Sequence, residues 1–160
     1  MTQTQEKALR KQYKEDIQAF SLRLIREASL PYEKVTSPDK IVRMINELYD
    51  LRDRPEEHAI IIGFDVRMNP VGVFMLAQGN TTSAIVSPPE IFKRLMLCNA
   101  HSFALIHNHP SGDCHPSTED TTLYKRLKKA GDLLNILIRD SIVIGYDKYY
   151  SEVAQCVASY

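Results

Sequence analysis

The sequence predicts a single α/β domain in which helices pack on a mixed sheet. Short apolar runs bounded by turn residues predict buried strands, and these runs alternate with segments whose apolar residues recur at helical spacing. The chain has 160 residues, which is enough for one domain with a substantial core. No internal repeat and no low-complexity tract interrupts the pattern.

The first third of the chain gives the weaker signals. Residues 3–19 are polar with scattered apolar positions and predict a helix or a mobile arm. Residues 20–28 place apolar side chains between charged ones, which favours a strand. A helix is expected to begin with Ser37 as N-cap and Pro38 at the first helical position, and its apolar residues recur to about Leu51.

Two strands and a capped helix are expected in the middle of the chain. The strands cover about 58–65 and 71–78 and flank a turn at 67–70. Ser87 and Glu90 have the spacing of a capping box, in which each side chain bonds the other residue's backbone N–H. The helix that follows is expected to bury Ile91, Phe92, Leu95 and Met96.

The second half of the chain alternates strand and helix. An apolar run predicts a buried strand over 102–109, and Pro110 should end it because proline cannot donate to a sheet ladder. A helix follows with Ser117 as its N-cap, and strands are expected at 136–145 and 149–151. The inner stripe of that helix is expected to be Leu123, Leu127, Ala130 and Leu134.

Composition argues against several classes of partner. The chain has 20 basic and 20 acidic residues and a net charge of zero, so no strong basic field exists to hold nucleic acid or anionic lipid. The sequence shows no apolar run of membrane-spanning length and no signal-peptide pattern. Three cysteines without framework spacing argue against a disulfide scaffold and predict a reducing cytoplasm.

Residues 107–120 contain the chemically most informative pattern. If the strand stays extended, His107 and His109 point to the same face because strand side chains alternate with period two. Asp120 lies three residues after the expected N-cap Ser117, where a helix N-terminus favours a negative charge. The intervening loop is long enough to fold this carboxylate back toward the histidines.

Two imidazoles and one carboxylate can hold one metal ion and leave a coordination position open. Three protein ligands plus water is the composition of a catalytic zinc site, whereas structural sites use four ligands. The competing interpretation is that the histidines decorate a loop and that Ser117 and Asp120 form only a capping box. On the residues alone, both interpretations stay open.

This spacing also resembles the JAMM motif, H-x-H-P-x6-S-x2-D, of the JAB/MPN metalloprotease superfamily. The sequence of residues 107–113 is similar to that of the bacterial RadC family within this superfamily. The resemblance runs from about residue 55 to about residue 151. It implies a JAB/MPN-like, cytidine-deaminase-like mixed sheet flanked by helices. The motif positions are His107, His109, Pro110, Ser117 and Asp120.

The resemblance further implies a glutamate just before the first strand of the domain. Glu56 and Glu57 are both candidates, and counting back from Asp65 favours Glu57. A solvated charge at the start of a strand is the alternative for either residue.

The implied reaction is hydrolysis of a peptide or isopeptide bond by a zinc-bound water. His107, His109 and Asp120 would hold Zn²⁺, and Glu57 would act as general base and then general acid. Ser117 would donate a hydrogen bond to the oxyanion, unless it is simply the helix cap. The ligand set alone would also fit other hydrolyses or a deaminase.

The chain departs from the family pattern in two places. Asp140 is followed by Ser141, where RadC-like chains usually have histidine. Longer family members carry a DNA-binding helix-hairpin-helix module with glycine-containing hairpins, whereas the first glycine here is Gly63. We therefore expect residues 1–55 to be a helix/strand lead-in and 56–160 to be the metallohydrolase domain.

Two other functions stay open at this point. The protein could be a DNA-associated accessory protein of the RadC type, with the basic residues at 125–129 contacting phosphate, although a solvated helix face is the favoured interpretation of those residues. It could also be a non-catalytic JAB scaffold. The substrate is expected to be a peptide or protein, no membrane partner is expected, and residues 153–160 could mediate homo-oligomer formation.

Overall fold

A computed structural model describes residues 2–5, 35, 37–78 and 86–159. The helix or arm expected at 3–19 lies almost wholly outside the described residues, and the strand expected at 20–28 lies wholly outside them. The helices are α2 (Pro38–Tyr49), the 3₁₀ turn η1 (Leu51–Asp53), α3 (Pro88–Leu97) and α4 (Thr118–Leu134). The strands are β1 (His58–Phe64), β2 (Pro70–Gln78), β3 (Ser102–Asn108), β4 (Leu137–Ile144), β5 (Lys148–Ser151) and β6 (Cys156–Ser159).

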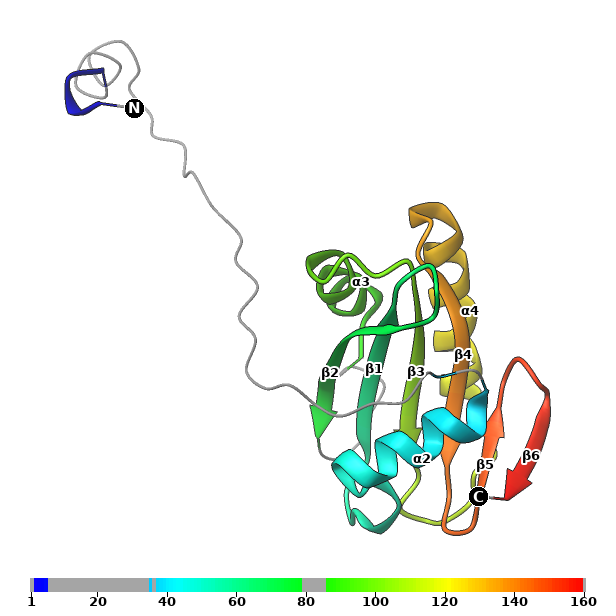
Figure 1. Ribbon diagram of the computed structural model, residues 1–160. Coiled ribbons are helices and arrows are strands. Elements are labelled where there is room, and N and C mark those ends of the chain that lie inside the picture. Colours follow the sequence, from blue (N-terminus) through cyan, green and yellow to red (C-terminus); the bar gives the residue numbers. More distant parts are fainter. Residues whose placement is uncertain (1, 6–34, 36, 79–85, 160) are drawn as a thin grey trace.

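The six described strands form one mixed sheet in the order β2-β1-β3-β4-β5-β6 (Figure 1). Only β3 and β4 pair in parallel, and every other neighbouring pair is antiparallel. The parallel pair follows from the chain between its strands, because parallel neighbours need a crossover connection and α4 provides it. The predicted α/β domain with a mixed sheet is confirmed.

The two faces of the sheet carry separate hydrophobic cores. Helix α2 covers one face, where its apolar side chains pack against residues such as Ile60, Ile106 and Ile142. Helices α3 and α4 cover the other face, which includes Ile61 and Leu105. Strands β1 and β3 are therefore buried along their whole length, which explains why they appear in the sequence as continuous apolar runs rather than alternating ones.

The crossover fixes where a functional site can form. Because α4 returns the chain across the sheet, its N-terminus lies at the carboxyl end of β3 (Figure 1). The residues that follow β3 and the first turn of α4 are consequently neighbours. Sites at the carboxyl ends of strands are a general feature of α/β sheets.

Helix ends agree with the sequence at one helix and differ at two. Ser117 and Asp120 form a complete capping box at α4. Ser87 is the N-cap of α3 but makes no side-chain cap hydrogen bond, so the expected capping box with Glu90 is wrong. Glu90 instead pairs with Lys93 and Arg94, one helical turn further on, at 2.7 Å each. Ser37 likewise caps α2 without a side-chain hydrogen bond.

Three further details differ from the sequence prediction. Met96 and Leu134, both expected to face the core, are exposed. Strand β6, which we did not predict, pairs with β5 and forms one edge of the sheet. Its residues 156–159 fall within the C-terminal segment considered for self-association.

Within the described ranges, none of the helices has the length and apolar character needed to cross a membrane.

Candidate metal centre

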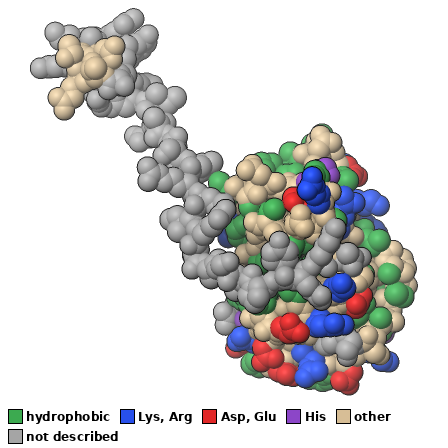
Figure 2. Space-filling view, in the orientation of Figure 1, with side chains coloured by type: hydrophobic (Ala, Val, Ile, Leu, Met, Phe, Trp, Pro, Cys, Tyr) green, Lys and Arg blue, Asp and Glu red, His purple; other side chains and the backbone are tan. Residues whose placement is uncertain are grey.

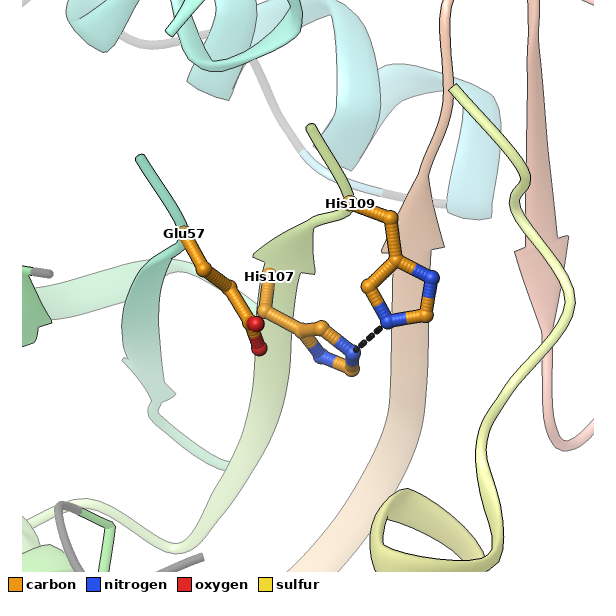
Figure 3. A group of neighbouring side chains, drawn as sticks. All are labelled: Glu57, His107 and His109. Atoms are coloured by element: carbon orange, nitrogen blue, oxygen red, sulfur yellow. Dashed lines mark hydrogen bonds between the residues drawn. The ribbon is translucent and has the colours of Figure 1, made fainter. Parts of the chain in front are cut away.

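Four side chains converge where β3 ends, where α4 begins and just before β1. His107 lies near the end of β3, and His109 follows that strand. Asp120 comes from the first turn of α4, and Glu57 precedes β1. Figure 3 shows the Glu57 carboxylate and the two imidazoles directed toward one another.

The register between β1 and β3 explains why Glu57, and not Glu56, faces the histidines. Ala59 is the cross-strand partner of His107, so both point to the same face. Residue 57 shares that face because side chains alternate with period two, and residue 56 does not. Glu56 instead lies 3.7 Å from the His58 imidazole.

The distances within the cluster are those expected for ligands of one small cation. The Nε2 atoms of His107 and His109 are 3.2 Å apart. Asp120 places Oδ1 3.2 Å from His107 Nε2 and Oδ2 3.4 Å from His109 Nε2. Zinc bonds of about 2.0 Å in a tetrahedron separate neighbouring ligand atoms by about 3.3 Å. Glu57, His107 and His109 also form a group whose ligand atoms all lie within 4.8 Å, and it can hold a metal ion.

A hydrogen bond to the backbone outside the cluster determines which nitrogen of the His109 ring carries the proton. The other nitrogen faces the cluster without one. His109 Nδ1 is 2.8 Å from the Asp113 carbonyl oxygen. A carbonyl oxygen only accepts, so Nδ1 carries the proton and donates it. In the neutral ring, Nε2 is then a bare lone pair directed at His107 and Asp120. A backbone carbonyl that fixes the tautomer in this way is the usual partner of a metal-binding histidine.

The capping box orients the Asp120 carboxylate. The Ser117 backbone N–H and the Ser117 hydroxyl both donate to Asp120 Oδ2, at 2.7 Å and 2.6 Å. The Asp120 N–H donates in turn to Ser117 Oγ at 3.1 Å. The hydroxyl proton of Ser117 is therefore engaged with Asp120 in this structure. Its predicted oxyanion role requires that bond to be released, and it stays a prediction.

Electrostatics of the cluster favour a positive charge between its members. Burial alone would raise the pKa of Asp120, but the His107 and His109 imidazoles and the Ser117 hydroxyl beside its carboxylate outweigh this effect and hold the pKa well below its usual range. The hydrogen bond with Asp120 raises the pKa of His109, against the opposing effect of burial. An ionised carboxylate facing two imidazole nitrogens suits a divalent cation, so the donor set fits zinc in chemical type as well as in spacing.

The loop between β3 and α4 is fixed against the turn after β4. Gly112 has a φ of +82°, and a Cβ atom there would meet the Tyr146 ring at 2.2 Å. The Tyr146 hydroxyl donates to the Pro110 carbonyl oxygen at 2.9 Å. At Gly145, a Cβ atom would meet the Gly112 carbonyl oxygen at 2.3 Å. Tight packing of this kind holds the loop that carries the Asp113 carbonyl.

The same loop contains a second group of metal-binding residue types, Asp113, Cys114 and His115, whose ligand atoms also lie within 4.8 Å. Asp113 Oδ1 and His115 Nδ1 are 2.6 Å apart, so these two side chains already bond each other. Cys114 is buried, and burial raises the pKa of its thiol, which disfavours the thiolate that a metal would need.

Sequence reasoning missed two residues that support the cluster. Asp113 acts through its backbone carbonyl, which no side-chain pattern reveals. Asn108 is buried between the two histidines and points to the opposite face. The only available signal for it was a polar residue at the end of an otherwise apolar strand.

The fold and the cluster together define an α/β domain with a candidate metal centre at the carboxyl end of its parallel strand pair. Comparison with protein families identifies the family of this domain, because residues 35–156 match the model of the RadC-like JAB domain. The chain belongs to this family.

Named relatives agree with this assignment. A UPF0758 protein of Caldanaerobacter subterraneus subsp. tengcongensis is 36% identical over 111 residues, covering 69% of this chain and 47% of the relative. A UPF0758 protein of Desulforamulus reducens is 36% identical over 129 residues, covering 79% and 56%. A UPF0758 protein of Chlorobaculum parvum is 37% identical over 99 residues, covering 62% and 45%. The chain thus spans about half the length of these relatives.

Proposed function

We propose that the protein is a zinc-dependent hydrolase of peptide or isopeptide bonds, a metallopeptidase of the JAMM type. The observation that carries the proposal is the closeness of Asp120 to both imidazoles, 3.2 Å from His107 and 3.4 Å from His109. Three protein ligands leave a fourth position for water, as in catalytic zinc sites.

Asp120 and Glu57 take different roles in this proposal. Asp120 has the two short carboxylate–imidazole distances, and its own hydrogen bonds to Ser117 fix its orientation. Glu57 forms a looser group with His107 and His109, in which the ligand atoms lie within 4.8 Å of one another. We therefore assign Asp120 as the third ligand and Glu57 as the general base.

Each side chain then has a chemical task. Bound zinc would supply a water with a pKa of about 7 and a Lewis acid for the scissile carbonyl. Glu57 accepts the proton of the attacking water and returns it to the leaving amine. His109 keeps its lone pair toward the centre because Asp113 holds the opposite nitrogen. Ser117 orients Asp120, and its hydroxyl donates to the oxyanion when that bond is released.

Metal content and a matched pair of glutamate variants test the proposal. We expect about one zinc per chain, lost in Asp120→Ala. Glu57→Gln should retain zinc and lower hydrolysis by about 10²- to 10⁴-fold on a library of linear and lysine-linked peptides. Glu56→Gln is the control, because it changes the adjacent carboxylate on the other face. Absence of zinc after refolding with the metal would overturn the proposal.

A second candidate function is a DNA-associated accessory role. Lys125, Arg126, Lys128 and Lys129 are exposed on α4 and could contact phosphates. Against it, the net charge is zero, and basic and acidic side chains are interspersed on the face seen in Figure 2. Affinity for duplex or single-stranded DNA that falls steeply with salt would support this role, and no binding at low salt would exclude it.

The remaining alternative is a non-catalytic scaffold. This alternative would be favoured if the wild type and Glu57→Gln both bound zinc and neither hydrolysed any peptide in the library.

For either function we propose a reducing cytoplasmic location, because the three cysteines Cys98, Cys114 and Cys156 are free thiols.

A further inference from the structure

The structure places one polar side chain, Asn108, between the two histidines but on the opposite side of β3. Its relative exposure is 1%. Its neighbours of the same parity, Ile106 and Ile144, belong to the core beneath α2. The side chain therefore has no access to the metal cluster, yet it is buried and polar and must be bonded there.

The side chain of Asn108 makes its hydrogen bonds with the backbone of the segment that carries Glu57. Its Oδ1 accepts from the His58 backbone N–H at 2.7 Å. Its Nδ2 donates to the Glu56 carbonyl oxygen at 3.1 Å and to the Arg54 carbonyl oxygen at 3.4 Å. The Glu56 carbonyl belongs to the peptide group before Glu57, and the His58 N–H belongs to the peptide group after it. One side chain thus holds both peptide groups that flank Glu57.

These bonds replace the sheet ladder at the place where it stops. Strand β1 begins at His58, and its pairing with β3 begins at Ala59, so Glu57 lies just outside the ladder. Fixing both flanking peptide groups fixes the φ and ψ of Glu57 and hence the direction of its side chain. The position of a general base matters steeply, because a shift of about 1 Å can cost about 10²-fold in rate.

The chemistry of the contacts is specific to an amide. The segment presents one donor and two acceptors, and only a carboxamide of this length offers one acceptor and a two-hydrogen donor. A carboxylate at the same position would accept from His58 but would face the Glu56 and Arg54 carbonyl oxygens with another acceptor. An alanine would leave all three backbone groups to find other partners.

We propose that Asn108 is a positioning residue that aims Glu57 at the metal centre from the other face of the sheet. Three consecutive residues would then supply two metal ligands on one face and the clamp for the general base on the other. This inference rests on the proposed function, in which Glu57 acts as the base.

The first test needs no metal and no substrate. In the metal-free protein, hydrogen exchange of the His58 amide measured by NMR should accelerate by at least about tenfold in Asn108→Ala. Asn108→Asp is the second variant, because it keeps the size of the side chain and the acceptor for His58. Ser151→Ala is the matched control, since it breaks a buried 2.6 Å bond to Asp140 toward the other edge of the sheet. It should lower stability without changing this amide.

The second test asks whether Asn108 acts through Glu57. Acetohydroxamate is the probe for the zinc-loaded protein, because a hydroxamate bound to the metal would bring a donor that the Glu57 carboxylate can accept. Asn108→Ala should weaken its affinity by about tenfold while zinc affinity changes less than about threefold, a smaller effect than loss of a direct ligand contact. In the Glu57→Gln background, the Asn108 substitution should have no further effect.

Each outcome decides the proposal. Additive losses in the double variant, or unchanged acetohydroxamate affinity in folded Asn108→Ala and Asn108→Asp, would overturn it. Unchanged exchange of the His58 amide in both variants would also overturn it. A chain that binds no zinc would instead overturn the proposed function, while the exchange comparison would still decide whether Asn108 holds the Glu57 segment.

Discussion

At the scale of single residues, the protonation of His109 governs the metal centre. Its Nδ1 donates to the Asp113 carbonyl, so the second proton that it can carry sits on Nε2, between His107 and Asp120. The hydrogen bond with Asp120 raises the pKa of His109 above 6.5, the usual value for histidine. A metal ion and this proton therefore compete for the same nitrogen.

Zinc affinity should consequently rise with pH. Below the raised pKa of His109, binding must displace a proton, so affinity should fall by about tenfold per pH unit. In the metal-free protein, the contribution of His109 to the free energy of unfolding changes in the opposite direction and falls as pH rises. Protonated His109 stabilises the fold fully below about pH 6.5, and this contribution is lost as pH rises through the raised pKa.

Calorimetry in two buffers of different ionisation enthalpy would measure the released proton. His115→Ala is a suitable control, because that imidazole is exposed and bonded to Asp113 rather than to the cluster. Zinc affinity that stays constant between pH 6 and pH 8 would contradict the competition.

His58 provides a separate prediction on stability. Its side chain is 2% exposed, and within the described residues neither ring nitrogen makes a hydrogen bond, although Nε2 lies 3.7 Å from the exposed Glu56 carboxylate. A buried polar group without a partner costs about 1–3 kcal/mol. His58→Leu should therefore raise the free energy of unfolding by about 1 kcal/mol, while the backbone N–H keeps its bond to Asn108. Urea denaturation would measure the change, and a clear loss of stability would show that the imidazole is partnered in solution.

Sequence alone could predict that His107, His109 and Asp120 meet at the centre, but not what holds them. The spacing of His107, His109 and Asp120 is local, and the strand–loop–helix pattern brings them together. The partners of Asn108 lie 50 to 54 residues away in the chain, so no local pattern points to them. Their identity depends on the register of β1 against β3.

At the scale of elements, the loop between β3 and α4 is the part most sensitive to substitution. Gly112→Ala would force a side chain into a backbone conformation with φ of +82° and into the Tyr146 ring. The strained φ costs about 1–2 kcal/mol, and overpacking typically adds about 1–3 kcal/mol. Because this loop carries the Asp113 carbonyl that orients His109, zinc affinity should also fall, by about 10- to 100-fold.

The double variant Gly112→Ala/Tyr146→Ala separates the two causes. Removal of the ring relieves the overlap but leaves the backbone strain, so stability should recover only in part. Asp147→Ala is the control, because its side chain is exposed in the neighbouring turn after β4. Titration of zinc and thermal unfolding measure the two effects, and an unchanged zinc affinity in Gly112→Ala would show that the loop does not orient His109.

The elements also show where local patterns mislead. The same N-cap spacing occurs at Ser87/Glu90 and at Ser117/Asp120, but only the second pair forms a capping box. Lys93 and Arg94 draw the Glu90 carboxylate forward along α3. Strand β6 is short and mostly exposed, so it has neither a hydrophobic run nor a clear alternation, and only its pairing with β5 defines it.

At the scale of the whole molecule, connections decide which pairings the sequence can predict. Strands β1 and β2 are joined by a short turn, as are β4 and β5, so their antiparallel pairing follows from the chain. A helix between β3 and β4 predicts their parallel pairing. The antiparallel contact of β1 with β3 spans α3 and has no local signal, yet it is this contact that brings Glu57 to the histidines.

Zinc should therefore stabilise the whole domain, because its proposed ligands come from β3, the loop after it and α4. A ligand that binds only the folded state, present at about 100 times its dissociation constant, contributes about 2.7 kcal/mol. For a chain of this size, that corresponds to a rise in Tm of roughly 5–10 °C. Chelation should reverse the rise, and Asp120→Ala should show little of it.

The same titration distinguishes a specific centre from scattered metal binding. Zinc that binds exposed histidines and carboxylates should shift the Tm of wild type and Asp120→Ala alike, because neither surface site depends on that carboxylate. Zinc that binds the predicted centre should shift the wild type and Glu57→Gln equally, since the base is not a ligand, and spare Asp120→Ala. A larger loss in Glu57→Gln than in Asp120→Ala would exchange the roles of the two carboxylates and make Glu57, with His107 and His109, the ligand set.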